Sequence, residues 1–173
     1  MSLEGDKELD RQLRELAEIN NKMKDIVDTE IQKVRSAAER IVHVDTGEIR
    51  QSIYAEVQSN ETVITGTCWT NSRYAPFVEF GTGPKGQRDH NGISPEYTPA
   101  YKQSPWWIHE KDIDRRVAEK YHWFYIDTPE GRFYQCAGQP ASPFMYPALA
   151  DNVDGITEEI RDGFQKAIER RIK

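Results

Sequence analysis

Hydrophobic residues recur at helical spacing along the first quarter of the chain. Residues 5–43 contain no proline and, after Gly5, no glycine, and their apolar positions follow one another in steps of three, four and seven: Leu9, Leu13, Leu16, Met23, Val27, Val34, Ala37 and Ile41. This period is typical of one face of an α-helix. Asn20 and Glu30 interrupt that face. The pattern predicts an N-terminal helical segment over residues 1–43.

The predicted helix is long for a chain of this size. A continuous helix of about 38 residues measures about 57 Å, whereas a compact chain of 173 residues is about 40 Å across. We therefore expect one of two arrangements. Either the segment breaks near Asp28, with Thr29 capping a second helix that packs on the domain, or it stays continuous, projects and needs a partner.

The middle of the chain shows the shorter period of β-structure. Runs rich in β-branched and aromatic residues at 54–57 and 62–69 flank Ser59-Asn60-Glu61, and similar runs at 122–126 and 132–136 flank a turn containing Pro129 and Gly131. Each pair predicts an antiparallel hairpin. Short helices are expected at 48–53 and 112–121, and a third, carrying Tyr74, Phe77 and Phe80, before Gly81.

The last part of the chain returns to the helical period. After the proline-rich connector 138–143, apolar residues mark a second long stripe: Leu149, Val153, Ile156, Ile160, Phe164, Ile168 and Ile172. The fold class expected is α+β, with a small antiparallel sheet of about four strands flanked by the N-terminal and C-terminal helices. The expected domains are the helical segment 1–43 and an α+β domain over 44–173, which includes a long loop at about 84–105.

Composition and charge narrow the classes of function. The chain has a mass of 20.0 kDa, a net charge of −6 and a sequence pI of about 5.3. A general nucleic-acid binder usually presents a basic face, so this class is disfavoured, although a local basic strip is compatible with the composition. No apolar run approaches the roughly 18 residues of a membrane span, and we expect no membrane partner.

Catalytic signals are weak throughout. Asp45-Thr46-Gly47 matches the D-T-G of aspartic proteases, but the triplet follows a helix, where a helix-terminating turn explains it better. Asp89-His90-Asn91 would suit a nuclease only with further metal ligands, and none has recognisable spacing. Cys68 and Cys136 are too few and too far apart for a zinc site or a disulfide framework. We therefore assign no catalytic residue, no metal ligand and no cofactor.

The loop and the aromatic residues that follow it are the candidate contact surface for a partner. Lys85, Arg88 and Lys102 are basic residues of the loop, and Trp106 and Trp107 stand at its end. Aromatic and cationic side chains are enriched in the cores of protein interfaces. Packing in the chain's own core is the alternative role for these aromatics, and the sequence leaves both open.

Four sequence blocks, in order, resemble the tail-completion (head–tail joining, or neck) family of siphophages and prophages, which is related to tail-terminator proteins. They are VDTGEIRQSI at 44–53, YAPFVEFGTG at 74–83, GQPASPFMYPAL at 138–149, and the C-terminal amphipathic helix. The resemblance implies a non-enzymatic subunit of a ring between the head connector and the tail tube, and six is the number of copies that it suggests. It also implies core positions for Phe77, Phe80 and Phe144.

The resemblance sets the expected partners and location. The partners are other neck, tail and connector proteins, together with further copies of the chain in a homo-oligomeric ring, and contact with DNA in the ring's lumen is left open. The location is the virion, and the bacterial host cytoplasm during assembly. Two other functions remain as alternatives: a cytosolic adaptor that pairs through its N-terminal helix, and a small hydrolase or nuclease that uses Asp45 or His90.

Overall fold

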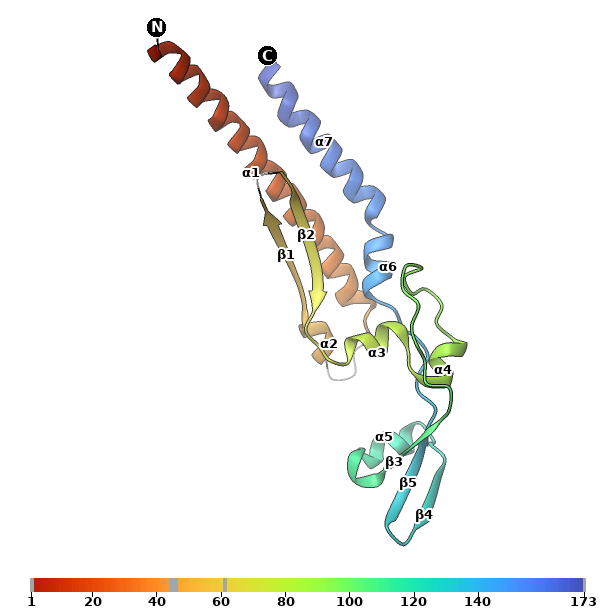
Figure 1. Cartoon of the computed structure of the whole chain (residues 1–173). Helices are drawn as coiled ribbons and strands as arrows, with labels where there is room; N and C mark the ends of the chain where they lie inside the picture. Colours follow the sequence, from red (N-terminus) through yellow and green to blue (C-terminus); the bar gives the residue numbers. More distant parts are fainter. Residues whose placement is uncertain (1, 44–46, 61, 173) are drawn as a thin grey trace. The chain divides into compact units, whose positions relative to one another are not determined.

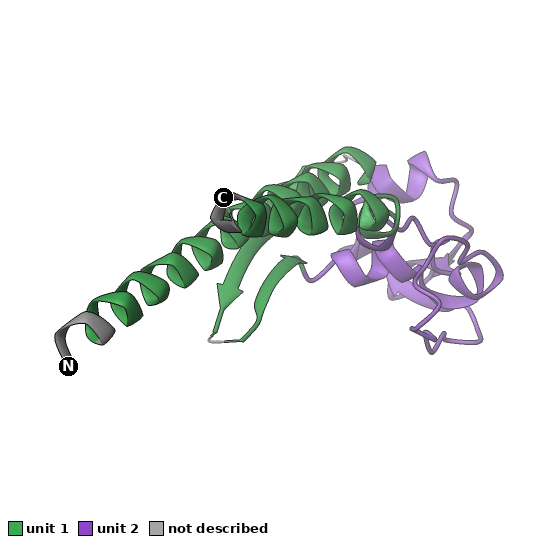
Figure 2. Ribbon diagram, turned by 90° about the horizontal axis from the view of Figure 1, so that it is seen from above, with its two compact units in different colours: residues 1–72, 147–173 green, residues 73–146 purple. Residues whose placement is uncertain are grey.

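The computed structural model describes residues 2–43, 47–60 and 62–172 and divides the chain into two compact units (Figure 2). The first unit comprises residues 1–72 and 147–173, and the second comprises residues 73–146. Their charges differ. The first unit contains fourteen Lys and Arg against twenty Asp and Glu, and the second contains nine of each, so the whole net charge of −6 belongs to the first unit.

The N-terminal segment is one continuous helix, α1 (Ser2–Ile41), of 40 residues (Figure 1). The alternative of a break near Thr29 is wrong. The Thr29 hydroxyl donates to the carbonyl of Asp25 at 2.8 Å, four residues back, so it bonds to the helix in which it lies instead of capping a new one. The apolar face is buried in the second half of the helix, at Met23, Ile31, Val34, Ala37 and Ala38, and Val42, just after the helix, is buried as well.

A two-stranded hairpin covers part of this buried face. The short helix α2 (Glu48–Gln51) leads into β1 (Ile53–Ser59), which pairs antiparallel with β2 (Ile64–Thr70), Ile53 lying opposite Thr70. The hairpin approaches α1 closely at Gly66, where an added Cβ would lie 3.0 Å from Val27 and 3.2 Å from Ile31. The first predicted hairpin and the short helix before it are confirmed.

The chain's end forms two helices, α6 (Met145–Ala150) and α7 (Val153–Ile172), instead of one. They are separated at Asp151 and Asn152, and the Asn152 side-chain amide donates to the carbonyl of Ala148 at 2.8 Å. Within the first unit α7 runs antiparallel to α1, and Gly163 allows its backbone to pack against Ile26. The N-terminal end of α1 extends beyond the end of α7 (Figure 2).

The second unit combines short helices with a small sheet. Its helices are α3 (Ala75–Phe80), α4 (Gly83–Arg88) and α5 (Arg115–Lys120), with a 3₁₀ turn η1 (Glu110–Asp112). Its strands are β3 (Trp106–His109), β4 (Tyr125–Thr128) and β5 (Gly131–Cys136), in the antiparallel order β3-β5-β4. The predicted hairpin at 122–136 is confirmed as β4 and β5.

The α+β fold class is confirmed, with its strands distributed over two sheets. The pattern did not show that Trp106–His109 is a strand, because this run pairs with β5, in the register Trp106 opposite Cys136, and a pairing over such a separation leaves no local signal. The expected loop is also shorter than 84–105. Its first residues belong to α4, and only residues 89–105 lack helix and strand.

Candidate interaction surface

The second unit contains a cavity of about 830 Å³ whose walls are largely aromatic. We call it the aromatic groove. Its lining combines α3 and the start of α4 with the loop 97–102 and with β3. The residues that line it are Tyr74, Pro76, Phe77, Val78, Phe80, Gly81, Thr82, Gly83, Tyr97, Pro99, Ala100, Tyr101, Lys102, Trp106, Ile108 and Gln139. A concave, mostly apolar site with few polar groups is the usual form of a binding pocket.

Local contacts hold the walls of the groove in place. The Tyr101 hydroxyl donates to the carbonyl of Phe80 at 2.7 Å, and the rings of Phe80 and Tyr97 are in contact, with their centroids 4.4 Å apart. Gly86 allows the ring of Tyr101 to approach, since an added Cβ would lie 2.9 Å from it. These contacts fix the loop to α3 and α4.

One charged side chain lines the groove. The ammonium of Lys102 lies 5.0 Å from the centroid of the Trp106 ring, within the range of a cation–π contact. No ion pair joins Lys102 to any residue that the structure describes. The groove therefore combines an apolar floor with one positive charge and has no carboxylate in its walls.

The structure separates the five residues predicted to contact a partner. Lys102 and Trp106 meet in the groove. Lys85 and Arg88 lie exposed on α4 outside its lining, and Trp107 is 43% exposed on β3, with its ring 6.0 Å from that of Phe124. Their role in binding stays a prediction, and the groove supports it most directly for Lys102 and Trp106.

Glu79 joins the second and third blocks, and sequence reasoning did not single it out. This carboxylate is only 6% exposed and accepts hydrogen bonds from the backbone N–H groups of Phe144 (2.7 Å), Met145 (2.9 Å) and Tyr146 (3.0 Å). It thereby satisfies donors at the start of α6, where a negative charge also suits the helix dipole. An acidic residue within the apolar run of α3 was the one available signal.

Further backbone bonds join the same two segments. The carbonyl of Val78 accepts from Ser142 at 2.8 Å, and Thr82 and Gln139 exchange backbone bonds of 2.9 and 3.2 Å. Gly138 has φ +80°, and an added Cβ there would clash with the carbonyl of Thr82. We call these bonds, with those of Glu79, the clasp. Phe144 is fully buried beside it, as expected, but Phe77 is 53% exposed, so its expected core position is wrong.

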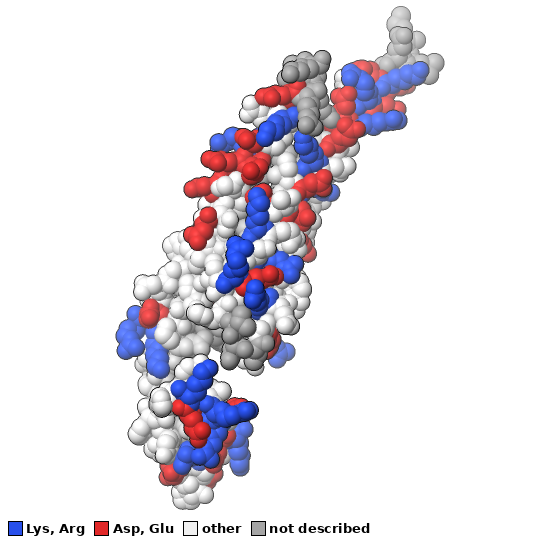
Figure 3. Space-filling model, turned by 180° about the vertical axis from the view of Figure 1, so that it is seen from behind, with Lys and Arg blue, Asp and Glu red and all other residues white. Residues whose placement is uncertain are grey.

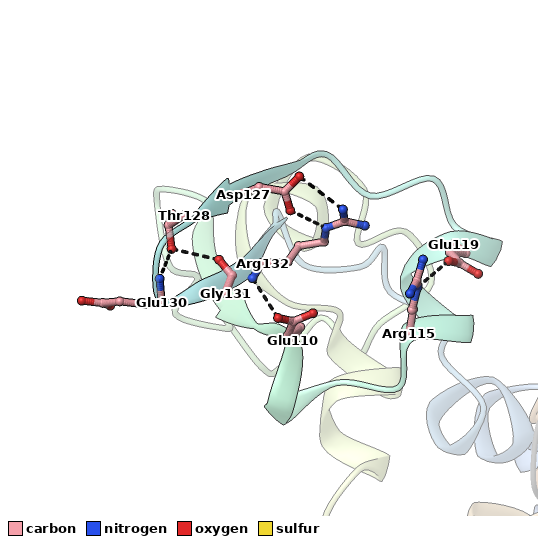
Figure 4. Close-up of polar contacts among 8 residues, drawn as sticks. All are labelled: Glu110, Arg115, Glu119, Asp127, Thr128, Glu130, Gly131 and Arg132. Atoms are coloured by element: carbon pink, nitrogen blue, oxygen red, sulfur yellow. Dashed lines mark hydrogen bonds and ion pairs between the residues drawn. The ribbon is translucent and has the colours of Figure 1, made fainter.

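A second polar cluster surrounds the turn between β4 and β5 (Figure 4). The Arg132 guanidinium donates to both oxygens of Asp127, at 2.8 and 3.2 Å, and lies 3.9 Å from the Tyr125 ring. The Glu110 carboxylate accepts from the Arg132 backbone N–H at 3.0 Å. These bonds fix the hairpin to the 3₁₀ turn and bring no nucleophile next to a base.

The Asp127 ion pair gives a pH-dependent signal. Hydrogen bonds from Arg132 lower the pKa of the Asp127 carboxyl below its ordinary value. The pair's contribution to stability is present above the unfolded-state pKa and is lost as the pH falls through the lower folded-state pKa. Because the pair is exposed, we expect little effect on stability. NMR titration should show a depressed Asp127 midpoint that returns toward the ordinary value in Arg132→Gln, and an unchanged midpoint would contradict the bidentate pair.

His90 and Asp89, which were considered for catalysis, make hydrogen bonds within their own segment of the chain. Asp45 and Thr46 fall outside the described residues. The His90 Nδ1 lies 2.8 Å from the carbonyl of Gln87, and Asp89 accepts from the side chain of Asn91. Within the described ranges no three His, Cys, Asp or Glu side chains are grouped to hold a metal ion, and no helix has the length and hydrophobicity of a membrane span.

Burial raises the pKa of the Cys68 thiol, which disfavours the reactive thiolate.

The end of α1 exposes another apolar surface. Leu9, Leu13 and Leu16 are 55%, 54% and 60% exposed, although they continue the face that is buried from Met23 onward. We call these three leucines the tip stripe. Acidic and basic side chains are interspersed over the helices of the first unit on the face seen in Figure 3, which shows no continuous basic patch there.

Comparison with known proteins bears on the segment that includes α1, the first hairpin and α3. Residues 7–81 match the family described as "Bacteriophage HK97-gp10, putative tail-component". The resemblance to a phage tail-protein family is thereby confirmed for this segment. No curated protein and no solved structure matches the chain at a significant level. The match to the HK97-gp10-like family ends at Gly81, so the aromatic groove and the clasp lie mostly in the part of the chain beyond it.

Proposed function

We propose that the chain is a structural assembly protein of a phage or prophage neck, where it joins the head connector to the tail as a subunit of a ring. The observation that carries this proposal is the match of residues 7–81 to a family of phage tail components. The matched segment includes most of α1, whose tip stripe is exposed. A subunit of an assembly needs such surfaces, because its apolar contacts are completed only by its neighbours.

The charge distribution supports assembly that depends on partners. The net charge of −6 belongs to the first unit, so identical first units repel one another, by an amount that salt screens. We therefore propose that the isolated chain is a monomer or a weak oligomer and closes its ring on neck, tail or connector proteins. A head-to-tail contact closes into a ring when its rotation allows. The proposed location is the neck of the virion, after assembly in the host cytoplasm.

Mass spectrometry of purified virions tests this proposal. The chain should be present in intact particles, at a copy number of a single small ring, and should remain with the neck when heads and tails are separated. Its absence from particles that contain the other structural proteins would overturn the proposal. The adaptor alternative makes a different prediction for the isolated chain: a tight dimer, insensitive to salt, in light scattering.

The enzyme alternative predicts turnover, and we expect none. The purified chain should leave casein, plasmid DNA and RNA intact, with and without Mg²⁺, Mn²⁺ or Zn²⁺. Among the described residues no cluster could hold a metal ion, and the His90 ring lies against the carbonyl of Gln87 at the end of α4. Gel assays over several hours measure this directly. Turnover that is abolished by Asp45→Ala or His90→Ala would establish the hydrolase alternative instead.

A further inference from the structure

We propose that the tip stripe of one copy docks, as a helix, into the aromatic groove of a second copy. This inference deepens the proposed function, on which it rests, by assigning the two surfaces of the contact between ring subunits. The two surfaces are different, so the contact is head-to-tail and each copy can both donate a tip and accept one. The tip belongs to the first unit and the groove to the second.

The tip stripe has the spacing that grooves recognise. Leu9, Leu13 and Leu16 lie at positions i, i+4 and i+7 of α1. These are the anchor positions of an amphipathic helix that lays one face into a hydrophobic groove. All three leucines are more than half exposed, and they continue the face that the hairpin and α7 cover farther along the helix. A partner on the tip stripe would therefore extend an apolar contact that the fold already makes.

Charge on the tip is arranged around the leucines. At about 3.6 residues per turn, Asp6 and Asp10 border the tip stripe on one side, whereas Lys7, Arg11 and Arg14 lie toward the opposite face. Arg11 is paired with Glu8 at 2.6 Å and Glu15 at 2.9 Å. Asp6 and Asp10 form no ion pair with any residue that the structure describes. The edge of the stripe is thus an apolar surface with two carboxylates beside it.

The groove complements the tip stripe both in its apolar lining and in its charge. Its lining has several aromatic rings, of which Tyr74, Phe77 and Tyr97 are each more than half exposed. Its one charge is the ammonium of Lys102, which contacts the Trp106 ring and has no carboxylate in the lining to pair with. An acidic apolar helix therefore finds an apolar floor and a cation. A basic helix would bring its charges next to Lys102 without compensation.

Pairing of two tips is less favourable than docking into the groove. The tip stripe contains three leucines over about two turns of helix, which is short for a two-stranded coiled coil. Two tips would also bring Asp6 and Asp10 of both copies close together. The groove avoids both costs, because its walls are already fixed by the contacts of Tyr101 and Tyr97 with Phe80.

A mixing experiment with two full-length variants separates the two modes. Leu13→Glu disrupts the tip stripe and leaves the groove intact. Lys102→Glu disrupts the groove and leaves the tip stripe intact. Val63→Glu and Lys120→Glu are the matched controls. Val63 is 54% exposed, as Leu13 is, and Lys120 lies 5.2 Å from the Tyr121 ring but outside the groove. Circular dichroism checks that each variant folds. Sedimentation at high protein concentration and about 0.15 M ionic strength, where distant charges are screened but close pairs are not, measures association.

Head-to-tail docking predicts that each variant alone self-associates at least about tenfold more weakly than the wild type, and that the two controls do not. Mixing Leu13→Glu with Lys102→Glu should restore association up to a dimer, because the intact tip of one can enter the intact groove of the other. If the mixture stays monomeric, or if the wild type does not self-associate under these conditions, the inference is wrong. Presence of the chain in the virion neck would then still support the proposed function, so the two can fail separately.

Discussion

Glu79→Ala is expected to lower the free energy of unfolding by about 2–4 kcal/mol, since hydrogen bonds to a charged group contribute more than neutral ones and three backbone donors lose their acceptor together. The Glu79 carboxylate is buried and accepts from Phe144, Met145 and Tyr146. Urea unfolding followed by circular dichroism measures the change. Glu79→Gln, which keeps one acceptor oxygen, should lose roughly half as much.

Glu96→Ala is the matched control for this prediction. Glu96 lies in the same unit, and its side chain is exposed. Its removal should change the free energy of unfolding by less than about 0.5 kcal/mol, as is usual for surface positions. If Glu79→Ala unfolds at the same urea concentration as the control, Glu79 does not hold the start of α6 and its three hydrogen bonds contribute no stability.

Ile53→Ala should be similarly damaging in the first unit. Ile53 is the fully buried first residue of β1, where the hairpin packs on α1. Removing its outer carbon atoms loses transfer free energy and leaves a cavity, which together cost about 2–5 kcal/mol. Thermal and urea unfolding measure the loss.

Ile41→Ala provides the comparison for Ile53→Ala. Ile41 is the last residue of α1 and is 39% exposed, and alanine favours helix, so the expected loss is below about 1 kcal/mol. Equal losses for the two variants would mean that the hairpin is not packed on α1 as the structure shows.

The sequence predicted those elements whose signal is local. The apolar period from Leu9 to Ile41 predicted a helical segment, and the runs that flank residues 59–61 and 127–131 predicted both hairpins. Continuity of α1 was left open, because the size of a compact globule argued against so long a helix. That argument does not hold here, since the N-terminal end of α1 extends past the end of α7 (Figure 2) and its leucines stay exposed.

The features that the sequence did not predict depend on contacts between distant segments. The strand β3 exists because it pairs with β5, and Glu79 is buried because it meets the start of α6, 65 residues away. The aromatic groove has the same origin, since α3 and the loop at Tyr97 and Tyr101 come together only in the fold. Among the residues predicted to contact a partner, Lys102 and Trp106 could be named from their residue types alone. The contact between their side chains could not be predicted, because it depends on the fold.

Electron microscopy of particles made without the chain tests the central claim most directly. The gene is deleted from the phage or prophage that encodes it, and the lysate is compared with one in which the wild-type chain is supplied from a plasmid. A protein that joins head to tail predicts DNA-filled heads and separate tails in the deletion, and joined, infectious particles after complementation. Intact, infectious virions in the absence of the chain would contradict the account.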